Sequence, residues 1–284
     1  MMAAPPLAAR QAALRTILRE CRLLGPRWVP RAPADFLLWG RGFFVDPNKP
    51  NQRLMSLVPN CFAPAIRPPL NPSVLSWVRA RLRAGVLGCP QELADEAAAV
   101  VENIDAVKTF LRGQCTLSSC SSISEEHGLR VEAVSGLAQD GGGTEKGYVF
   151  TYNIRFTNVG PHRLRVIARQ YNFRDAHGRL RSIIRADQLE AAGVVGFTPL
   201  LPPGSSFEFG SGVMLPTPQG CLTGGFSVIR EPAIDEDAAA LHQQIESAEL
   251  MIRYAYYKDL AEVVHVPLGQ LRFDADVSCL QRRQ

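Results

Sequence analysis

Hydrophobic and polar residues alternate along much of the second half of the chain, in short runs separated by turn residues. The clearest alternation lies in residues 147–158, 201–209 and 210–220. A period of two residues is typical of antiparallel strands that bury one face. We therefore expect a β-sandwich in this half. Its predicted strands are about 128–138, 146–158, 163–174, 179–185, 206–215, 222–230 and 263–273.

The first half of the chain follows a helical period instead. In residues 7–24 the apolar side chains recur three and four positions apart, and the pair Gly25-Pro26 ends the run. A second helix is predicted over 74–84 and a third over 91–111, the latter opened by Pro90. Three helices between residues 7 and 112 can form a small bundle.

The predicted fold class is α+β multidomain, with an N-terminal three-helix bundle followed by an antiparallel β-sandwich that carries an inserted helix over about 235–254. Trp39, Phe43 and Phe44 have no local core, so we expect them to pack against a partner. The expected segments are a basic first helix (1–27), a Pro-rich aromatic insertion (28–72), helices two and three (73–112), a linker (113–127), the sandwich (128–276) with its helical insertion (233–260), and a tail (277–284).

The charge is mild overall, +4 in 284 residues, but it is unevenly distributed. Residues 1–34 contain six arginines and one acidic residue, Glu20. An Arg-rich, acid-poor start is typical of an organelle transit peptide, and equally of an amphipathic basic helix that stays in the mature protein. No apolar run is long enough to span a bilayer, so no transmembrane segment is expected.

Candidate chemistry is sparse. The seven cysteines are scattered without a Cys-x-x-Cys pair, which favours free thiols in a reducing compartment. No nucleophile elbow, phosphate-binding Walker loop or His-Glu-x-x-His motif occurs. We predict that the chain is not an enzyme and has no metal or cofactor of its own. The five histidines are isolated in the sequence: His127, His162, His177, His242 and His265.

The sandwich half resembles the ApaG family from about residue 128 to residue 275. The resemblance implies a fibronectin-III-like sandwich, used by eukaryotic members as a protein-interaction module. The matching elements are 148–152, 169–173, the 175–179 hairpin, Gly193-Val194-Val195-Gly196, Pro203-Gly204-x-x-Phe207, Ser211-Gly212, Thr217-Pro218-x-Gly220-x-x-x-Gly224, and Val266-Pro267-Leu268-x-x-Leu271-x-Phe273.

Two features depart from the ApaG pattern. Ala191 and Ala192 stand where the family has another glycine, and the helical insertion has no counterpart in it. Gly193 and Gly196 remain as a candidate ligand loop, because backbone N–H groups in such a turn can hold a phosphate. The alternative is a tight structural turn between strands.

The helical half resembles the LYR-motif family of small mitochondrial three-helix proteins. The resemblance lies in Ala13-Leu14-Arg15-Thr16-Ile17-Leu18-Arg19 and in Val78-Arg79-Ala80-Arg81-Leu82-Arg83. Leu14 replaces the family's tyrosine and Leu82 replaces an aromatic residue, and the Pro-rich insertion is unusual for the family.

The LYR resemblance implies binding of mitochondrial acyl carrier protein, with its acyl-phosphopantetheine as the only associated cofactor. Arg15, Arg19, Arg79 and Arg83 would then face acidic groups of that partner. Small residues such as Ala12, Ala13 and Ala80 would leave room for the acyl chain between the helices. The alternative is that the arginines form a solvated basic face above a filled core.

The function predicted from both resemblances is a non-catalytic adaptor or accessory subunit on the matrix side of the mitochondrion. It would bind acyl carrier protein through the bundle and subunits of a larger assembly through the sandwich. That assembly would be a respiratory complex, a mitoribosome or an assembly intermediate. Two alternatives stay open: a module for a phosphate-containing small ligand, and a mitoribosomal protein that contacts RNA through its arginines.

Overall fold

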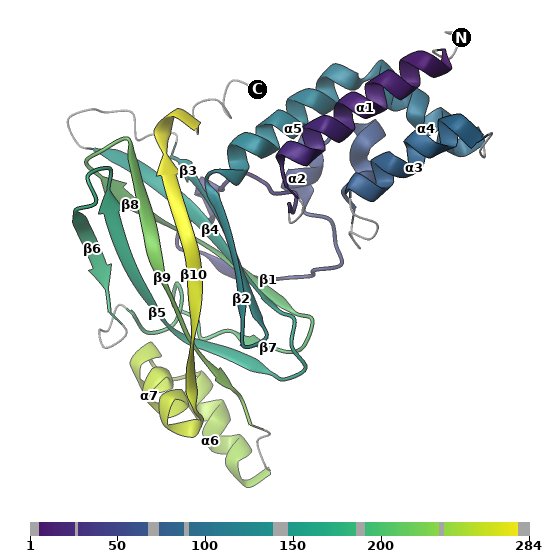
Figure 1. The fold of residues 1–284 in the computed structure, drawn as a ribbon. Coiled ribbons are helices and arrows are strands. Elements are labelled where there is room, and N and C mark those ends of the chain that lie inside the picture. Colours follow the sequence, from purple (N-terminus) through teal and green to yellow (C-terminus); the bar gives the residue numbers. More distant parts are fainter. Residues whose placement is uncertain are drawn as a thin grey trace. The chain divides into compact units, whose positions relative to one another are not determined.

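The chain folds into two compact units (Figure 1). The computed structural model describes residues 6–25, 28–67, 74–87, 91–138, 147–185, 191–232 and 236–277. Unit 1 consists of Met1–Ala32 and Asn48–Ser119, and unit 2 of Pro33–Pro47 and Cys120–Gln284. The Pro-rich segment 28–72, expected as one insertion, is therefore shared between the two units.

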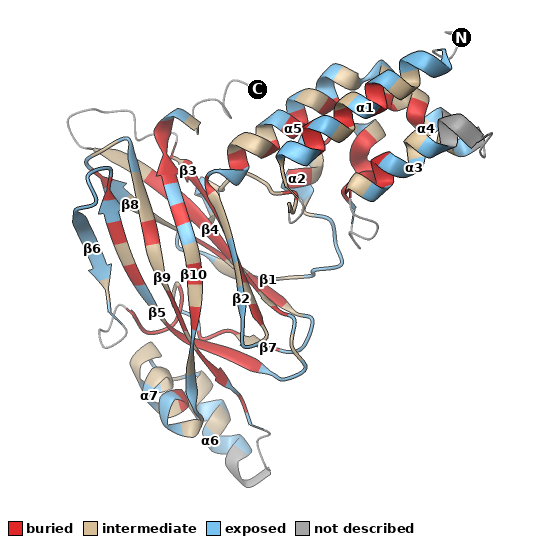
Figure 2. Cartoon of the chain, in the orientation of Figure 1, coloured by how far each residue is buried: buried red, intermediate tan, exposed pale blue. Residues whose placement is uncertain are grey.

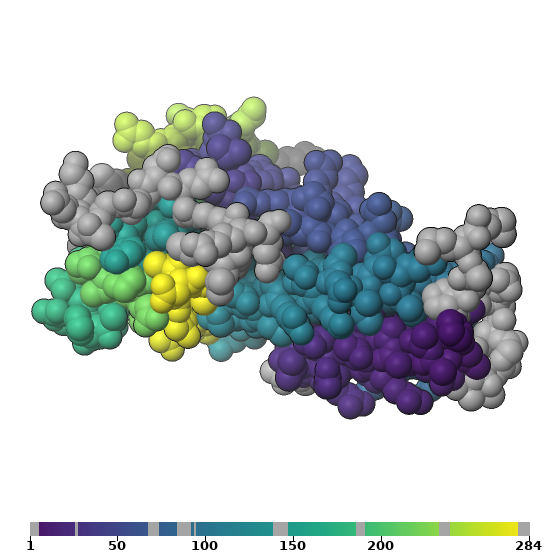
Figure 3. Space-filling model, turned by 90° about the horizontal axis from the view of Figure 1, so that it is seen from above, coloured from purple at the N-terminus to yellow at the C-terminus, as the bar shows by residue number. Residues whose placement is uncertain are grey.

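Unit 1 is helical. α1 carries its buried residues on one stripe, and Figure 3 shows its surface (purple) running beside that of α5, against which it packs. The helices of this unit are α1 (Leu7–Leu23), α2 (Gln52–Leu57), the short 3₁₀ helix η2 (Asn60–Ala65), α3 (Val74–Leu87), α4 (Gln91–Glu102) and α5 (Ile104–Ser118).

The core of unit 1 depends on a residue from the Pro-rich segment. Phe62 in η2 is fully buried, and its ring makes edge contacts with Trp77 of α3 at 5.4 Å and with Phe110 of α5 at 6.2 Å between centroids. Buried Gln114 of α5 exchanges two 2.9 Å hydrogen bonds with the backbone of Arg31. Residues 48–66 are therefore part of the helical core rather than an appendage to it.

Two sequence predictions for unit 1 are wrong. The third helix is not continuous: Asn103 leaves helical geometry at φ −109° and ψ 23°, and it separates α4 from α5. The expected linker 113–127 is instead occupied by the end of α5 and by strand β2. In the Ser-rich stretch, the hydroxyls of Ser118 and Ser119 donate to carbonyls of the preceding turn, which accommodates them in a helix end.

Unit 2 is a sandwich of two antiparallel sheets. Among the described residues one sheet has the order β1-β8-β4-β3-β2 and the other β10-β9-β5-β6, with β7 paired to β5. The strands are β1 (Gly42–Val45), β2 (Ser121–Glu126), β3 (Leu129–Leu137), β4 (Tyr148–Asn158), β5 (Leu164–Asp175), β6 (Leu180–Ile184), β7 (Leu200–Leu201), β8 (Ser206–Leu215), β9 (Gln219–Arg230) and β10 (Val263–Asp274).

The alternating pattern sets the buried faces of these sheets, as the red positions in Figure 2 show. Phe156 of β4 contacts Phe209 of the same sheet and Phe226 of the opposite sheet, the latter at 4.7 Å between ring centroids. The strands predicted from alternation lie close to the observed ones. The sequence pattern did not reveal β1, β2 and β7, which are short or half-exposed.

The predicted single inserted helix is also wrong, because two helices stand in its place. α6 (Glu236–Glu246) and α7 (Leu250–Leu260) pack against each other at the end of the sandwich where β5 begins and β9 ends (Figure 1). They are separated by a turn in which Ser247 and Ala248 donate to carbonyls of α6. Buried Tyr257 on α7 packs with Ile167 of β5 and Ile229 of β9.

Candidate functional site

An aromatic segment, defined here as residues 35–45, lies along one edge of the sandwich. Its 3₁₀ turn η1 (Phe36–Leu38) is capped by Asp35, whose carboxylate accepts from the Leu37 N–H. β1 then pairs antiparallel with β8. Glycines of β8 make room for the segment: a Cβ at Gly212 would come within 2.4 Å of the Trp39 ring. The segment is therefore held in place by both backbone pairing and shape.

The outward side of the aromatic segment is apolar and accessible. Leu37 is 75% exposed and Phe44 is 59% exposed, although the Phe44 ring also contacts Phe207 of β8. Phe36, Trp39 and Phe43 are also exposed. Several large apolar side chains on one held segment are an uncommon surface for a chain without a partner. This arrangement makes the aromatic segment a candidate partner-binding surface.

The four arginines predicted to meet an acidic partner are all exposed in unit 1. Arg15 and Arg19 lie on α1, and Arg79 and Arg83 on α3, two helices that pack together. In the part of the chain that the structure describes, these guanidinium groups have no ion pair or hydrogen bond. They are available to a partner of opposite charge.

Their placement differs from the groove expected between the helices. At about 100° per residue, each pair lies roughly opposite the buried residues of its helix, such as Leu14 on α1 and Val78 on α3. Ala12 and Ala80 are exposed as well, so they do not line the interior of the bundle. The arginines lie on outward faces because the inward faces are filled with large apolar side chains.

The candidate ligand loop at Gly193 and Gly196 is a tight hairpin turn. The N–H groups of Val194 and Phe197 each donate to the other residue's carbonyl, at 2.8 and 2.9 Å, and that of Gly193 donates to Ile167. Val195 (φ 43°) and Gly196 (φ 87°) give the geometry of a type I′ turn. These three N–H groups are engaged internally, which argues against the predicted phosphate site.

A buried charged cluster anchors the inserted helices. The Arg165 guanidinium donates to Glu231 through Nε and Nη2, at 2.5 and 3.1 Å, and to the Thr198 carbonyl through Nη1 at 2.9 Å. Its Nη2 is also 2.6 Å from Glu246 Oε1 of α6. The guanidinium lies 4.1 Å from the centre of the Tyr257 ring of α7. One arginine therefore joins β5, β9, α6 and α7.

The groups around Arg165 complete the cluster. Tyr257 Oη donates to Glu246 at 2.7 Å. His242 Nε2 lies 3.5 Å from Glu231 Oε1 and 3.4 Å from Glu246 Oε1. Burial alone would raise the pKa of Glu246, but the Tyr257 hydrogen bond and the Arg165 charge together lower it. The cluster is suited to holding the inserted helices on the sandwich.

Sequence reasoning missed this cluster, although a signal was present. Arg165 interrupts the otherwise apolar run from Leu164 to Ala168, and a charge within a buried strand requires a partner of opposite sign. His242, isolated in the sequence, joins the cluster through contacts with carboxylates from distant positions. His127 and His162 lie in an exposed turn and an exposed loop, and both line one pocket.

Other chemistry is limited within the described residues. No set of three or more His, Cys, Asp or Glu side chains there is arranged to hold a metal ion. No helix in those ranges combines the length and hydropathy needed to cross a bilayer. Cys89 and Cys279 lie outside the described residues. The described cysteines are free thiols: Cys21, Cys61, Cys115, Cys120 and Cys221.

Comparison with known proteins identifies a family for unit 2. The family model of the ApaG domain matches residues 140–230, which include β4 to β9. Protein ApaG of Bordetella pertussis is 38% identical over 91 residues, 32% of this chain and 65% of that protein. Protein ApaG of Xanthomonas campestris is 38% identical over 95 residues, 34% of this chain and 70% of that protein.

The matched part of this chain thus spans just under two thirds of the length of the Bordetella relative. Among solved structures, a crystal structure of an ApaA protein from Bordetella pertussis has 26% identity and a TM-score of 0.38. That alignment covers 52% of this chain and 93% of the other.

Removing the central arginine should strongly destabilise unit 2. The substitution Arg165→Met leaves Glu231 buried without its main partner, and we expect the free energy of unfolding to fall by about 3–5 kcal/mol. Urea denaturation measures this free energy of unfolding. Arg163→Met is the matched control, because the Arg163 side chain is 46% exposed and its Nη2 lies 3.7 Å from Glu231. This control substitution should lower the free energy of unfolding by about 0–1 kcal/mol. Equal losses would contradict the anchoring role.

The cluster also predicts acid sensitivity. In the folded state the pKa of Glu246 is lowered from 4.5. The ionised carboxylate therefore contributes fully to the free energy of unfolding above pH 4.5, and this contribution is lost as the pH falls through the lowered pKa. We expect the free energy of unfolding of Glu246→Gln to decline less steeply below pH 4.5 than that of the native chain. Denaturation series at several pH values test this, and parallel slopes would oppose it.

Proposed function

This chain belongs to the ApaG family, and we propose that it acts as a non-catalytic adaptor whose sandwich docks on a larger assembly through the aromatic segment. The observation that carries the proposal is the exposed apolar side of residues 35–45. A segment fixed to β8 by backbone pairing loses little conformational entropy when a partner covers it. Exposed aromatic residues are also the side chains that most often dominate binding energy in interfaces.

The helical unit supplies the second contact in this proposal. Arg15 and Arg19 on α1, with Arg79 and Arg83 on α3, present guanidinium groups to an acidic partner. Guanidinium groups bind carboxylates and phosphates with paired donors, so an acidic helix or a phosphorylated prosthetic group suits them. We propose acyl carrier protein as this partner, on the basis of the LYR-like sequence alone. A contact with RNA is the competing hypothesis.

A mitochondrial location belongs to the same proposal. Its support is the excess of arginine over acidic residues in residues 1–34, which also contribute α1. The curated relatives named above are bacterial, and the family model matches residues 140–230, within unit 2. The mitochondrial location and the binding of acyl carrier protein are therefore hypotheses about unit 1, and they are independent of docking through the sandwich.

A charge placed on the aromatic segment should abolish docking. We expect Leu37→Glu to remove partner proteins that co-purify with the tagged full chain, since an acidic group would be desolvated in the interface. Quantitative mass spectrometry of the purified material measures the loss. Because Leu37 is highly exposed, the melting temperature should change by little.

Ile123→Glu is the control for this experiment. Ile123 is 41% exposed on β2, which is the opposite edge of the same sheet. The Ile123→Glu substitution adds the same negative charge to a similarly exposed apolar side chain outside the aromatic segment. Identical partner profiles for native chain and Leu37→Glu, or equal losses with both variants, would reject docking through residues 35–45.

Charge reversal on α1 tests the second contact. We expect Arg15→Glu with Arg19→Glu to eliminate co-elution of co-expressed acyl carrier protein at low salt, because opposed charges become like charges. Arg67→Glu, another exposed arginine of unit 1 outside α1 and α3, should retain it. Size-exclusion chromatography gives the readout. If the native chain elutes without acyl carrier protein at low salt, the carrier-protein hypothesis is wrong. Binding of the native chain to RNA would instead favour the RNA-contact hypothesis.

A further inference from the structure

Two tight loops of unit 2 meet at one end of the sandwich and frame a pocket. The β2–β3 hairpin turns through His127 and Gly128, both with positive φ, at 52° and 82°, as a two-residue type I′ loop requires. The Gly128 carbonyl accepts from the N–H groups of Val159 and Gly160 in the β4–β5 loop, at 2.9 and 3.2 Å. The two loops are therefore joined by backbone hydrogen bonds.

Buried Asn158 makes this frame rigid. Its Oδ1 accepts from the Gly160 N–H at 3.0 Å, and its Nδ2 donates to the carbonyls of His162 and Leu201 at 2.6 and 2.7 Å. A Cβ at Gly128 would lie 3.1 Å from the Gly160 Cα, so the loops approach each other closely. The positions from which the pocket side chains project are therefore fixed before any ligand arrives.

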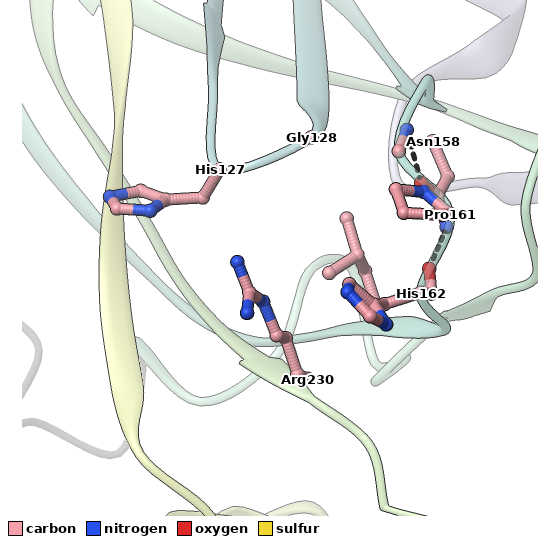
Figure 4. Close-up of a pocket in the computed structure, with 8 residues that line it drawn as sticks. His127, Gly128, Asn158, Pro161, His162 and Arg230 are labelled. Carbon is pink, nitrogen blue, oxygen red and sulfur yellow. Dashed lines mark hydrogen bonds between the residues drawn. The ribbon is translucent and has the colours of Figure 1, made fainter.

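Three residues with nitrogen-bearing side chains, from separate elements, line this pocket. His127 projects from the β2–β3 turn, His162 from the β4–β5 loop and Arg230 from the end of β9. In Figure 4 the Arg230 guanidinium lies next to the His162 ring, whereas the His127 ring points away from both. In the part of the chain that the structure describes, the Arg230 side chain has no hydrogen bond or ion pair. Its five donors are open to a ligand.

The local charge favours an anion. The residues that line the pocket include no carboxylate. Glu231, which follows Arg230 directly, turns inward and is paired with Arg165, so it does not neutralise Arg230.

From these contacts we infer that the pocket binds a single phosphate group, as inorganic phosphate or as a small phosphate monoester. Arg230 supplies the paired charged donors and His162 supplies a ring N–H donor next to it. The cavity volume is about 220 Å³. Pockets for larger organic ligands usually exceed about 300 Å³, which favours a small anion.

This site differs from the glycine loop in both place and mechanism. The N–H groups of Gly193, Val194 and Phe197 are engaged within their hairpin, whereas the donors at Arg230 are side-chain groups without a protein partner among the described residues. The inference is also independent of the adaptor proposal, which concerns the aromatic segment and the arginines of unit 1.

Calorimetric titration of the full chain tests the inference. The probes are inorganic phosphate, glycerol 3-phosphate as a monoester, and acetate as a singly charged control anion. At low ionic strength we expect saturable binding of one or both phosphates and no saturable heat with acetate. Stronger binding of the monoester would identify an esterified ligand, and stronger binding of inorganic phosphate would identify the free ion. Absence of saturable heat with both at 10 mM, about the weakest affinity the site should have, overturns the proposal.

Variants locate the binding. Arg230→Gln should weaken phosphate affinity by about tenfold or more, and His162→Asn by several-fold. Arg41→Gln, an exposed arginine of unit 2 outside the pocket, should leave affinity unchanged, as should Val195→Gly in the glycine loop. Melting temperatures establish that each variant is folded. Unchanged affinity in folded Arg230→Gln, or an equal loss in Arg41→Gln, would overturn the assignment to this pocket.

Discussion

The two sheets of unit 2 meet through interlocked aromatic rings, and the other features of this unit depend on that contact. Phe156 and Phe226 come from opposite sheets and touch edge to face. Phe150 and Phe273 also come from opposite sheets and contact each other in a tilted arrangement, with ring centroids 5.2 Å apart. Because the core fixes which strand faces point inward, it also fixes what remains outside: the edge that accepts β1 and the strand ends that carry the pocket.

A second constraint is the buried charge of Arg165. A guanidinium within a strand next to the apolar core is tolerated only when its donors are satisfied, and Glu231, Thr198 and Glu246 satisfy them. The cluster links the inserted helices to β5 and β9 at several points. It also draws the carboxylate of Glu231 inward, which leaves neighbouring Arg230 without an acidic partner at the surface. One buried ion pair thus shapes both the insertion and the adjacent pocket.

The surfaces of the two units suggest different tasks. Unit 2 has an apolar edge suited to a protein partner and a basic pocket sized for a small anion, whereas unit 1 has exposed arginines above a filled apolar core. The family similarity covers the central strands of unit 2 and neither the helical unit nor the inserted helices. The proposed roles of those added parts therefore rest on their own residues.

Local pattern alone determined the main strands of unit 2, which are β3 to β6 and β8 to β10, because residues that alternate in polarity must place one face in a core. It also determined α1 and α3, through their apolar stripes. Only tertiary packing decided the rest. Phe62 entered the helical core because Trp77 and Phe110 surround it, and the Ser-rich stretch became ordered because β3 pairs with β2. Residues far apart in sequence, such as His127, His162 and Arg230, form a site only when the fold brings their loops together. The period of apolar residues along the chain does not predict which loops will be neighbours.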